Sequence, residues 1–144
     1  MEPKLMSYIT SKFATKGDMM AAEGMWQEII GEMLPRFKEA GALRQVVTQV
    51  WNQEGSFILG NLWEYVDEQA FIACQPLFRE AEAKLNERAG IPAINVPSRG
   101  IILHDIHLYD RHLSPHGLRQ HSCIAGGSVI ASRNKLARAA GRSR

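Results

Sequence analysis

The chain has 144 residues and a net charge of +2, and 45% of its residues are hydrophobic and 22% charged. This composition is typical of one globular domain, and the absence of an apolar run of about 18 residues argues against a transmembrane helix. The first residues also lack a basic segment followed by an apolar core, so we expect no secretory signal. Two distant cysteines, Cys74 and Cys123, lie in no metal-ligand spacing, which favours free thiols and a cytoplasmic location.

The first part of the chain predicts a strand followed by a long amphipathic helix. Apolar and polar residues partly alternate over 5–14, as in a strand. We expect the Asp18 side chain to cap a helix that ends at Gly41. Its apolar residues are spaced three and four apart: Met19, Ala22, Trp26, Ile29, Ile30, Met33 and Phe37. Pro35 should bend this helix near Gly31, because a proline ring clashes with the carbonyl four residues earlier.

The next two predicted strands form a hairpin. Residues 43–52 contain three valines and one tryptophan, and a short turn at 53–55 leads into the third strand of the chain, over 57–66. In this third strand, alternate side chains point to opposite faces, and both faces are largely apolar. A sheet with two apolar faces needs a cover on each of them.

A second helix and a last strand complete the pattern. Asp67 is placed to cap the helix, and Pro76 should split it into a short and a longer piece or kink it. Its apolar stripe consists of Ala70, Phe71, Cys74, Phe78, Ala81 and Leu85. Residues 90–98 contain two prolines and are expected to form a loop. Residues 99–109, RGIILHDIHLY, are expected to form the last strand.

The predicted order of strand, helix, strand, strand, helix, strand is that of the ferredoxin-like fold. In this α+β βαββαβ arrangement, two helices cover one face of a four-stranded antiparallel sheet. The other face stays bare although the strands are apolar on both sides. We therefore expect a homodimer in which a second copy of the chain covers the bare sheet face.

The junction LWEYVDEQAF, residues 62–71, resembles the strand-to-helix junction of dimeric α+β barrel proteins, which include antibiotic-biosynthesis-monooxygenase-like and NIPSNAP-like proteins. There the third strand ends in an aromatic residue and an acid, followed by a short acidic cap and an Ala-Phe helix start. The resemblance spans residues 5–109 in element order and implies this fold and a dimer. It also implies cofactor-free oxygenation or isomerisation if the chain is an enzyme, and some members bind haem. This chain departs from the oxygenase pattern because no histidine follows Asp67 before His104.

Candidate site residues lie on the third strand and around it. Asn61, Trp63 and Tyr65 share one face, and a polar group among aromatic residues is what a small-molecule pocket requires. Asn61 is a candidate orienting donor, since an unpaired buried amide costs about 1–3 kcal/mol. Trp63 and Tyr65, with Trp26 of the first helix, are candidate walls, although core packing explains these aromatic residues equally well. His104 is a candidate general base if it lines a cavity.

The histidines do not predict a metal site. On a strand, His104 and His107 would point to opposite faces, so a zinc site would need His107 together with His112 or His116 across a turn. A buried, hydrogen-bonded histidine and several surface histidines are the alternative. We expect no metal and no cofactor, with haem as the alternative. The chain has no phosphate-binding glycine loop, nucleophile elbow, CxxC or HExxH motif, which argues against NTPases, α/β hydrolases and common zinc peptidases.

The last 35 residues differ from the rest. Residues 110–144 carry 7 Lys/Arg against 1 Asp/Glu, whereas residues 1–109 carry 10 against 14. We therefore predict a domain over 1–109 and a basic extension over 110–144, which packs against the acidic body or the partner subunit. Clustered cations bind phosphates, but no aromatic platform or helix-turn-helix accompanies them, so we expect no specific nucleic acid.

Two functions follow from these predictions. The first is a homodimeric protein that binds a small apolar or aromatic molecule in a cavity between sheet and helices, and the sequence leaves open whether it is a catalyst. The second is an assembly protein of the same fold, whose apolar surfaces serve only oligomerisation. An open pocket bounded by Asn61 and His104 would favour the first function, and side chains filling that space would favour the second.

Overall fold

A computed structural model describes residues 2–108 of the chain. The described residues fall into two units, of which the first ends at His104 and the second begins at Asp105. The first unit consists of β1 (Leu5–Phe13), α1 (Lys16–Ala40), β2 (Ala42–Gln49), β3 (Phe57–Tyr65), α2 (Glu68–Arg88) and β4 (Ile94–Ile101). The predicted succession of strands and helices is thus confirmed.

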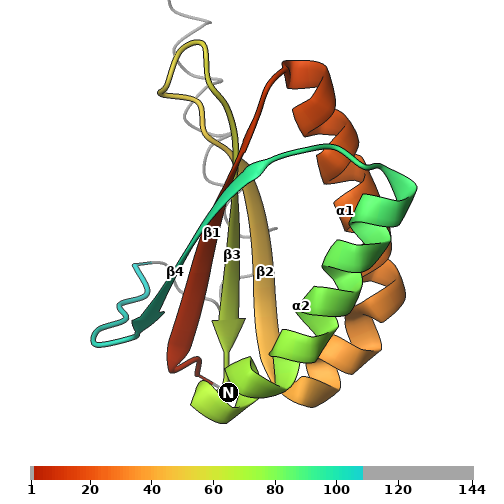
Figure 1. Ribbon diagram of the computed structural model, residues 1–144. Helices are drawn as coiled ribbons and strands as arrows, with labels where there is room; N and C mark the ends of the chain where they lie inside the picture. The colour runs from red at the N-terminus through yellow and green to blue at the C-terminus, as the bar shows by residue number, and fades with distance from the viewer. Residues whose placement is uncertain (1, 109–144) are drawn as a thin grey trace, which may run out of the picture. The chain divides into compact units, whose positions relative to one another are not determined.

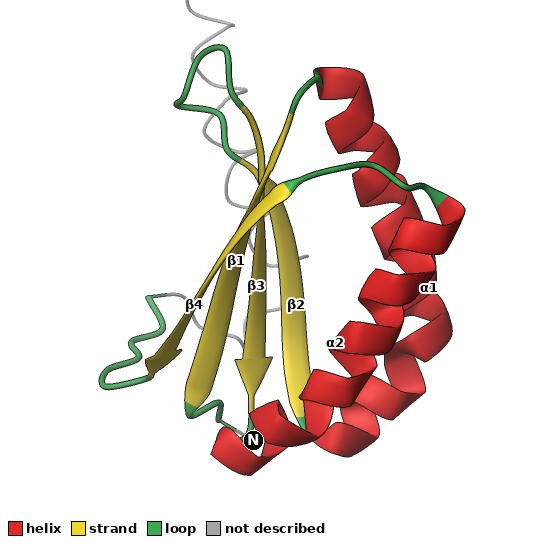
Figure 2. Cartoon of the chain, in the orientation of Figure 1, coloured by secondary structure: helices red, strands yellow, loops and turns green. Residues whose placement is uncertain are grey.

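The four strands form one sheet in the order β2-β3-β1-β4, and each neighbouring pair is antiparallel. β1 lies between β3 and β4, so that Ile9 is opposite both Asn61 and Pro97. Figure 1 shows α1 and α2 on the same face of this sheet. In Figure 2 the other face carries no helix of the part of the chain that is described. This is the ferredoxin-like α+β fold predicted from the sequence.

The core fills the layer between the sheet and the helices. Trp63 is only 2% exposed and lies against two other aromatic rings, with centroid distances of 4.9 Å to Phe37 and 5.0 Å to Phe78. Tyr65, on the same face of β3, is fully buried. Cys74 of α2 is a buried free thiol, as expected for a small core residue.

The helix caps agree with the sequence patterns except at the start of α1. Thr15, not Asp18, caps this helix, because the Thr15 Oγ1 accepts a hydrogen bond from the Asp18 amide at 3.1 Å. Gly41 ends α1 with a left-handed φ of 102°. Asp67 caps α2 as predicted, and its Oδ1 accepts from the Ala70 amide at 2.9 Å.

Neither proline interrupts its helix. α1 continues through Pro35, and α2 continues through Pro76, so the predicted division of the second helix is wrong. Residues near each proline, such as Phe37 in α1 and Cys74 and Leu77 in α2, are buried. Their packing offsets the backbone hydrogen bond that each proline removes. Among residues 2–108, no helix is long and apolar enough to cross a membrane.

The last strand is shifted from its predicted position. β4 covers Ile94–Ile101, so the loop predicted over 90–98 and the strand predicted over 99–109 are both wrong in their bounds. β4 tolerates Pro97 because it is an edge strand, where a missing backbone donor leaves no ladder partner unpaired. The chain leaves the strand after Ile101. Residues 109–144, which include His112, His116 and the predicted basic extension, lie outside the described residues.

Candidate functional site

A cavity of about 440 Å³ lies between the helix-covered face of the sheet and the two helices. Its volume is within the usual range for small-molecule sites, about 300–1,000 Å³. Side chains of all six elements contribute to its lining, and the walls are mainly apolar: they include Ile9, Trp26, Val47, Leu59, Phe71 and Phe78. The packed core therefore leaves an open space in the layer where the sequence predicts one.

The floor of the cavity follows from the alternation of side chains along β1. Ser7, Ile9 and Ser11 point to the helix-covered face, and each is opposite one residue of β4: Arg99, Pro97 and Asn95, respectively. Because these rows are two residues apart, the floor extends over about 14 Å along the strands. We call its two ends the Arg99 end (Ser7, Tyr65, Phe71 and Arg99) and the Glu23 end (Ser11, Phe13, Ala22, Glu23 and Asn95).

Asn61 provides hydrogen-bond donors in the middle of the floor. Gln45 Nε2 donates to Asn61 Oδ1 at 3.1 Å, which orients the amide group. The Nδ2 group of Asn61 has no acceptor among the residues that the structure describes, and Asn61 lines the cavity. Two N–H groups are therefore available to a bound molecule.

Two hydroxyl groups and a guanidinium group lie at the Arg99 end. Ser7 Oγ and Tyr65 Oη form a buried hydrogen bond of 2.9 Å. Burial raises the pKa of Tyr65 to about 12, although the Ser7 hydrogen bond and the nearby charge of Arg99 lower it. At neutral pH, Tyr65 is therefore a neutral phenol that donates or accepts a hydrogen bond. The Arg99 guanidinium lies over the Phe71 ring, with Cζ 4.7 Å from the ring centroid.

The sequence of this first unit matches a family of proteins. A family model described as "Domain of unknown function (DUF6974)" matches residues 2–102. The chain belongs to the DUF6974 family. No curated protein matches the sequence.

Solved structures show which fold this DUF6974 chain shares. A dimeric ferredoxin-like protein from an uncultured marine organism has a TM-score of 0.65 and 22% identity, over 73% of this chain and 100% of that one. A second such protein from an uncultured marine organism has a TM-score of 0.65 and 16% identity, over 72% and 98%. A monooxygenase of Streptomyces coelicolor in complex with nanaomycin D has a TM-score of 0.55 and 13% identity, over 74% and 94%. These structures share the ferredoxin-like fold that the resemblance of the 62–71 junction implies.

The structure brings together three of the five site residues predicted from the sequence. Asn61, Tyr65 and Trp26 all line the cavity of the DUF6974 chain. Trp63 does not line it, because its ring is enclosed in the aromatic core, where it contacts Phe78. The indole Nε1 groups of Trp26 and Trp63 are buried and have no hydrogen-bond partner in residues 2–108.

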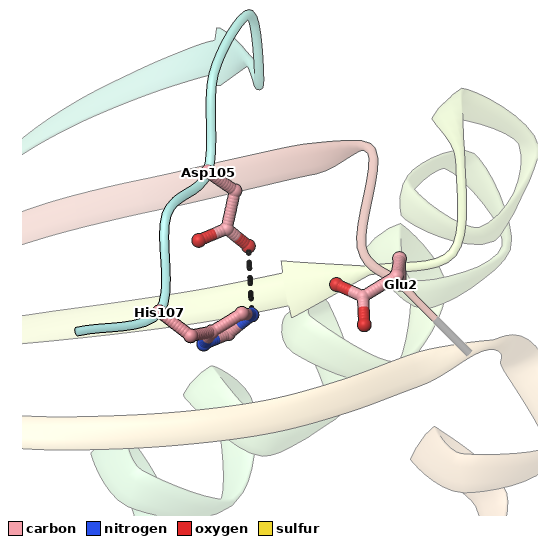
Figure 3. A group of neighbouring side chains, drawn as sticks. All are labelled: Glu2, Asp105 and His107. Atoms are coloured by element: carbon pink, nitrogen blue, oxygen red, sulfur yellow. Dashed lines mark ion pairs between the residues drawn. The ribbon is translucent and has the colours of Figure 1, made fainter. Parts of the chain in front are cut away.

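His104 lies away from these residues. It is exposed, follows β4 outside any strand and is not part of the cavity lining. His107, in the second unit, forms an ion pair with Asp105 when its imidazole is protonated, with 3.6 Å between Nε2 and Oδ2 (Figure 3). The pocket is therefore bounded by Asn61 but not by His104.

The sequence interpretation missed Ser7 and Arg99 as lining residues. The signal for Ser7 was present, because Ser7 and Ser11 are polar positions on the face of β1 that also carries Leu5, Ile9 and Phe13. Serine on an apolar strand face indicates either a buried hydrogen bond or a cavity. For Arg99 no comparable signal existed, because the two prolines in residues 90–98 predicted a loop where most of β4 lies.

Proposed function

We propose that this DUF6974 protein binds a small apolar or aromatic molecule in the cavity between its sheet and its helices. The observation that carries this proposal is a space of about 440 Å³ with apolar walls and, in its floor, the amide donors of Asn61, for which residues 2–108 provide no acceptor. Apolar surface provides affinity for such a molecule, and a few fixed polar groups orient it. We expect this binding in the cytoplasm, as the sequence predicts.

In this proposal Asn61 donates to a polar atom of the bound molecule, and Tyr65 and Trp26 form parts of the wall. Trp63 supports the wall from within the core by holding Phe78. The monooxygenase with the same fold supports oxygenation as a reaction of the bound molecule, and isomerisation is the alternative that the resemblance of the 62–71 junction implies. The role of His104 as the general base of such a reaction was predicted on the condition that it lines a cavity, and it does not line this one.

We further propose that a second copy of the chain covers the helix-free face of the sheet. Ile94 and Val96 alternate with two cavity-lining residues of β4, so they face the other side, where they are 68% and 59% exposed. Tyr8 on β1 is 38% exposed on the same face. The two marine proteins of the same fold are described as dimeric. This exposed apolar face also favours the second candidate function, an assembly protein, and the ligand experiment distinguishes the two.

The experiment measures binding of N-phenyl-1-naphthylamine, a neutral aromatic probe that fluoresces in apolar sites. We expect the wild-type protein to bind it and to unfold at a higher temperature in its presence, because a molecule that binds only the folded state stabilises it. Val47→Phe places a larger side chain in the cavity and should weaken probe binding by about tenfold, as expected from overpacking costs.

Leu34→Phe is the matched control, because Leu34 is 59% exposed on α1 and does not line the cavity. This variant should bind the probe as the wild type does. If the wild type does not bind the probe, or if both phenylalanine variants bind it as tightly as the wild type, the proposed cavity function is refuted and the assembly function is favoured.

A further inference from the structure

The arginines among residues 2–108 differ in their pairing according to their location. Three of the five form ion pairs with glutamates: Arg36 with Glu80, Arg44 with Glu64 and Arg88 with Glu32. The other two, Arg79 and Arg99, line the cavity and have no carboxylate partner in the described part of the chain. The unpaired guanidinium groups of residues 2–108 are thus the ones that a bound molecule can reach.

Arg99 is the better placed of the two to bind a ligand group. It lies directly opposite Ser7 across the β1–β4 ladder, and its guanidinium is held over the Phe71 ring. The hydrogen-bonded hydroxyls of Ser7 and Tyr65 belong to the same end of the cavity. A guanidinium stays charged at all relevant pH values, and its planar N–H groups match the two oxygens of a carboxylate.

The carboxylates of the cavity lie away from Arg99. Glu82 follows Phe71 by 11 residues on α2, which places it about 16 Å further along the helix axis. Glu23 follows Ala22, which packs with Phe13 at the opposite end of the floor. Arg79 lies one helical turn before Glu82 and partly offsets its charge. The cavity is therefore positive at the Arg99 end and carries its acidic groups toward the Glu23 end.

We propose that the molecule bound in this cavity is an organic anion, with an apolar or aromatic frame and a carboxylate or a comparable acidic group that binds Arg99. This inference rests on the proposed function and adds the charge and the orientation of the ligand. The acidic group accepts hydrogen bonds from Arg99 and from a hydroxyl of Ser7 or Tyr65. The frame extends over Ile9 toward the Glu23 end, whose carboxylates disfavour the reverse orientation.

Two probes with the same frame test this inference. 8-Anilinonaphthalene-1-sulfonate carries one sulfonate group that N-phenyl-1-naphthylamine lacks, so comparing them isolates the effect of the charge. Arg99→Gln should weaken binding of the sulfonate probe by about tenfold or more, the size expected for one charged hydrogen bond. The same substitution should change binding of the neutral probe less than about twofold.

Three variants serve as controls. Arg99→Lys keeps the charge and should restore part of the affinity for the sulfonate probe, although it loses the bidentate geometry. Arg36→Gln removes an arginine outside the cavity and should leave the affinity for both probes unchanged. Val47→Phe should weaken the binding of both probes. This result would show that the probes bind in the cavity and not on the exposed sheet face.

The outcomes separate this inference from the proposed function. If the neutral probe binds the wild type but Arg99→Gln lowers the affinity for both probes equally, or for neither, the inference is overturned and the cavity function stands. If neither probe binds the wild type, both are overturned. If Arg99→Gln does not fold, a salt titration of the wild type replaces it. Added salt should lower the affinity for the sulfonate probe only. An equal change in the affinity for both probes overturns the inference.

Discussion

Replacing Val96 with glutamate tests whether a second copy covers the sheet. Val96 is 59% exposed in the single chain and points away from the cavity. Burying this exposed part in an interface contributes about 1–2 kcal/mol, given about 1.5–3 kcal/mol for complete burial of an apolar side chain of this kind. In a symmetric dimer the residue is buried twice, so its loss costs about 2–4 kcal/mol per dimer. An unpaired carboxylate in the interface adds a desolvation penalty.

We therefore expect Val96→Glu to raise the dimer dissociation constant by at least about thirtyfold. Analytical ultracentrifugation over a concentration series measures this constant. Ile72→Glu is the matched control, because Ile72 is 53% exposed on α2, in the helical layer, and should leave the dimer unchanged. The reasoning is refuted if the wild type sediments as a monomer, or if both variants keep the wild-type dissociation constant.

Two further predictions concern the residues beside the cavity. Trp63→Ala should lower the free energy of unfolding by about 3–5 kcal/mol in chemical denaturation, because Trp63 is 2% exposed, whereas Trp51→Ala, at an 89% exposed position, should change it little; equal effects would contradict the core assignment. Burial raises the pKa of Tyr65 from 10.0 to about 12, so the unfolded chain loses this proton first and stability should fall as pH rises from about 10 to 12. Tyr65→Phe should show a smaller fall over that range, and an identical fall would contradict the shift.

The sequence was most informative where local patterns and tertiary contacts agree. The helix stripes, the Asp67 cap and the Gly41 stop each have a local signal, and the two-residue period of β3 indicated its two faces. β4 was misplaced because Pro97 is a loop signal, and only its edge position in the sheet makes it tolerable. The division of the second helix at Pro76 was wrong for a similar reason, since buried residues on both sides of Pro76 stabilise a continuous α2.

The candidate site was predicted in part for the same physical reason. Asn61, Tyr65 and Trp26 lie on elements whose faces the periodicity identifies, and all three line the cavity. His104 was predicted to lie on the last strand, but β4 ends at Ile101. The predicted direction of the His104 side chain therefore does not apply. Arg99 was not predicted to line the site, because the sequence does not indicate which residue of β1 it lies opposite, and in the structure this residue is Ser7. Such choices between partners depend on register, which a single sequence does not specify.

The most direct test of the cavity function follows the side-chain amide of Asn61 by ¹⁵N NMR during titration with N-phenyl-1-naphthylamine. The account predicts a saturable shift of the Asn61 Nδ2 resonance and of its hydrogen-bond partner Gln45, with no shift for Asn86, an exposed residue of α2 outside the cavity lining. Binding of the probe with no change in the Asn61 resonance would contradict the claim that this cavity is the binding site.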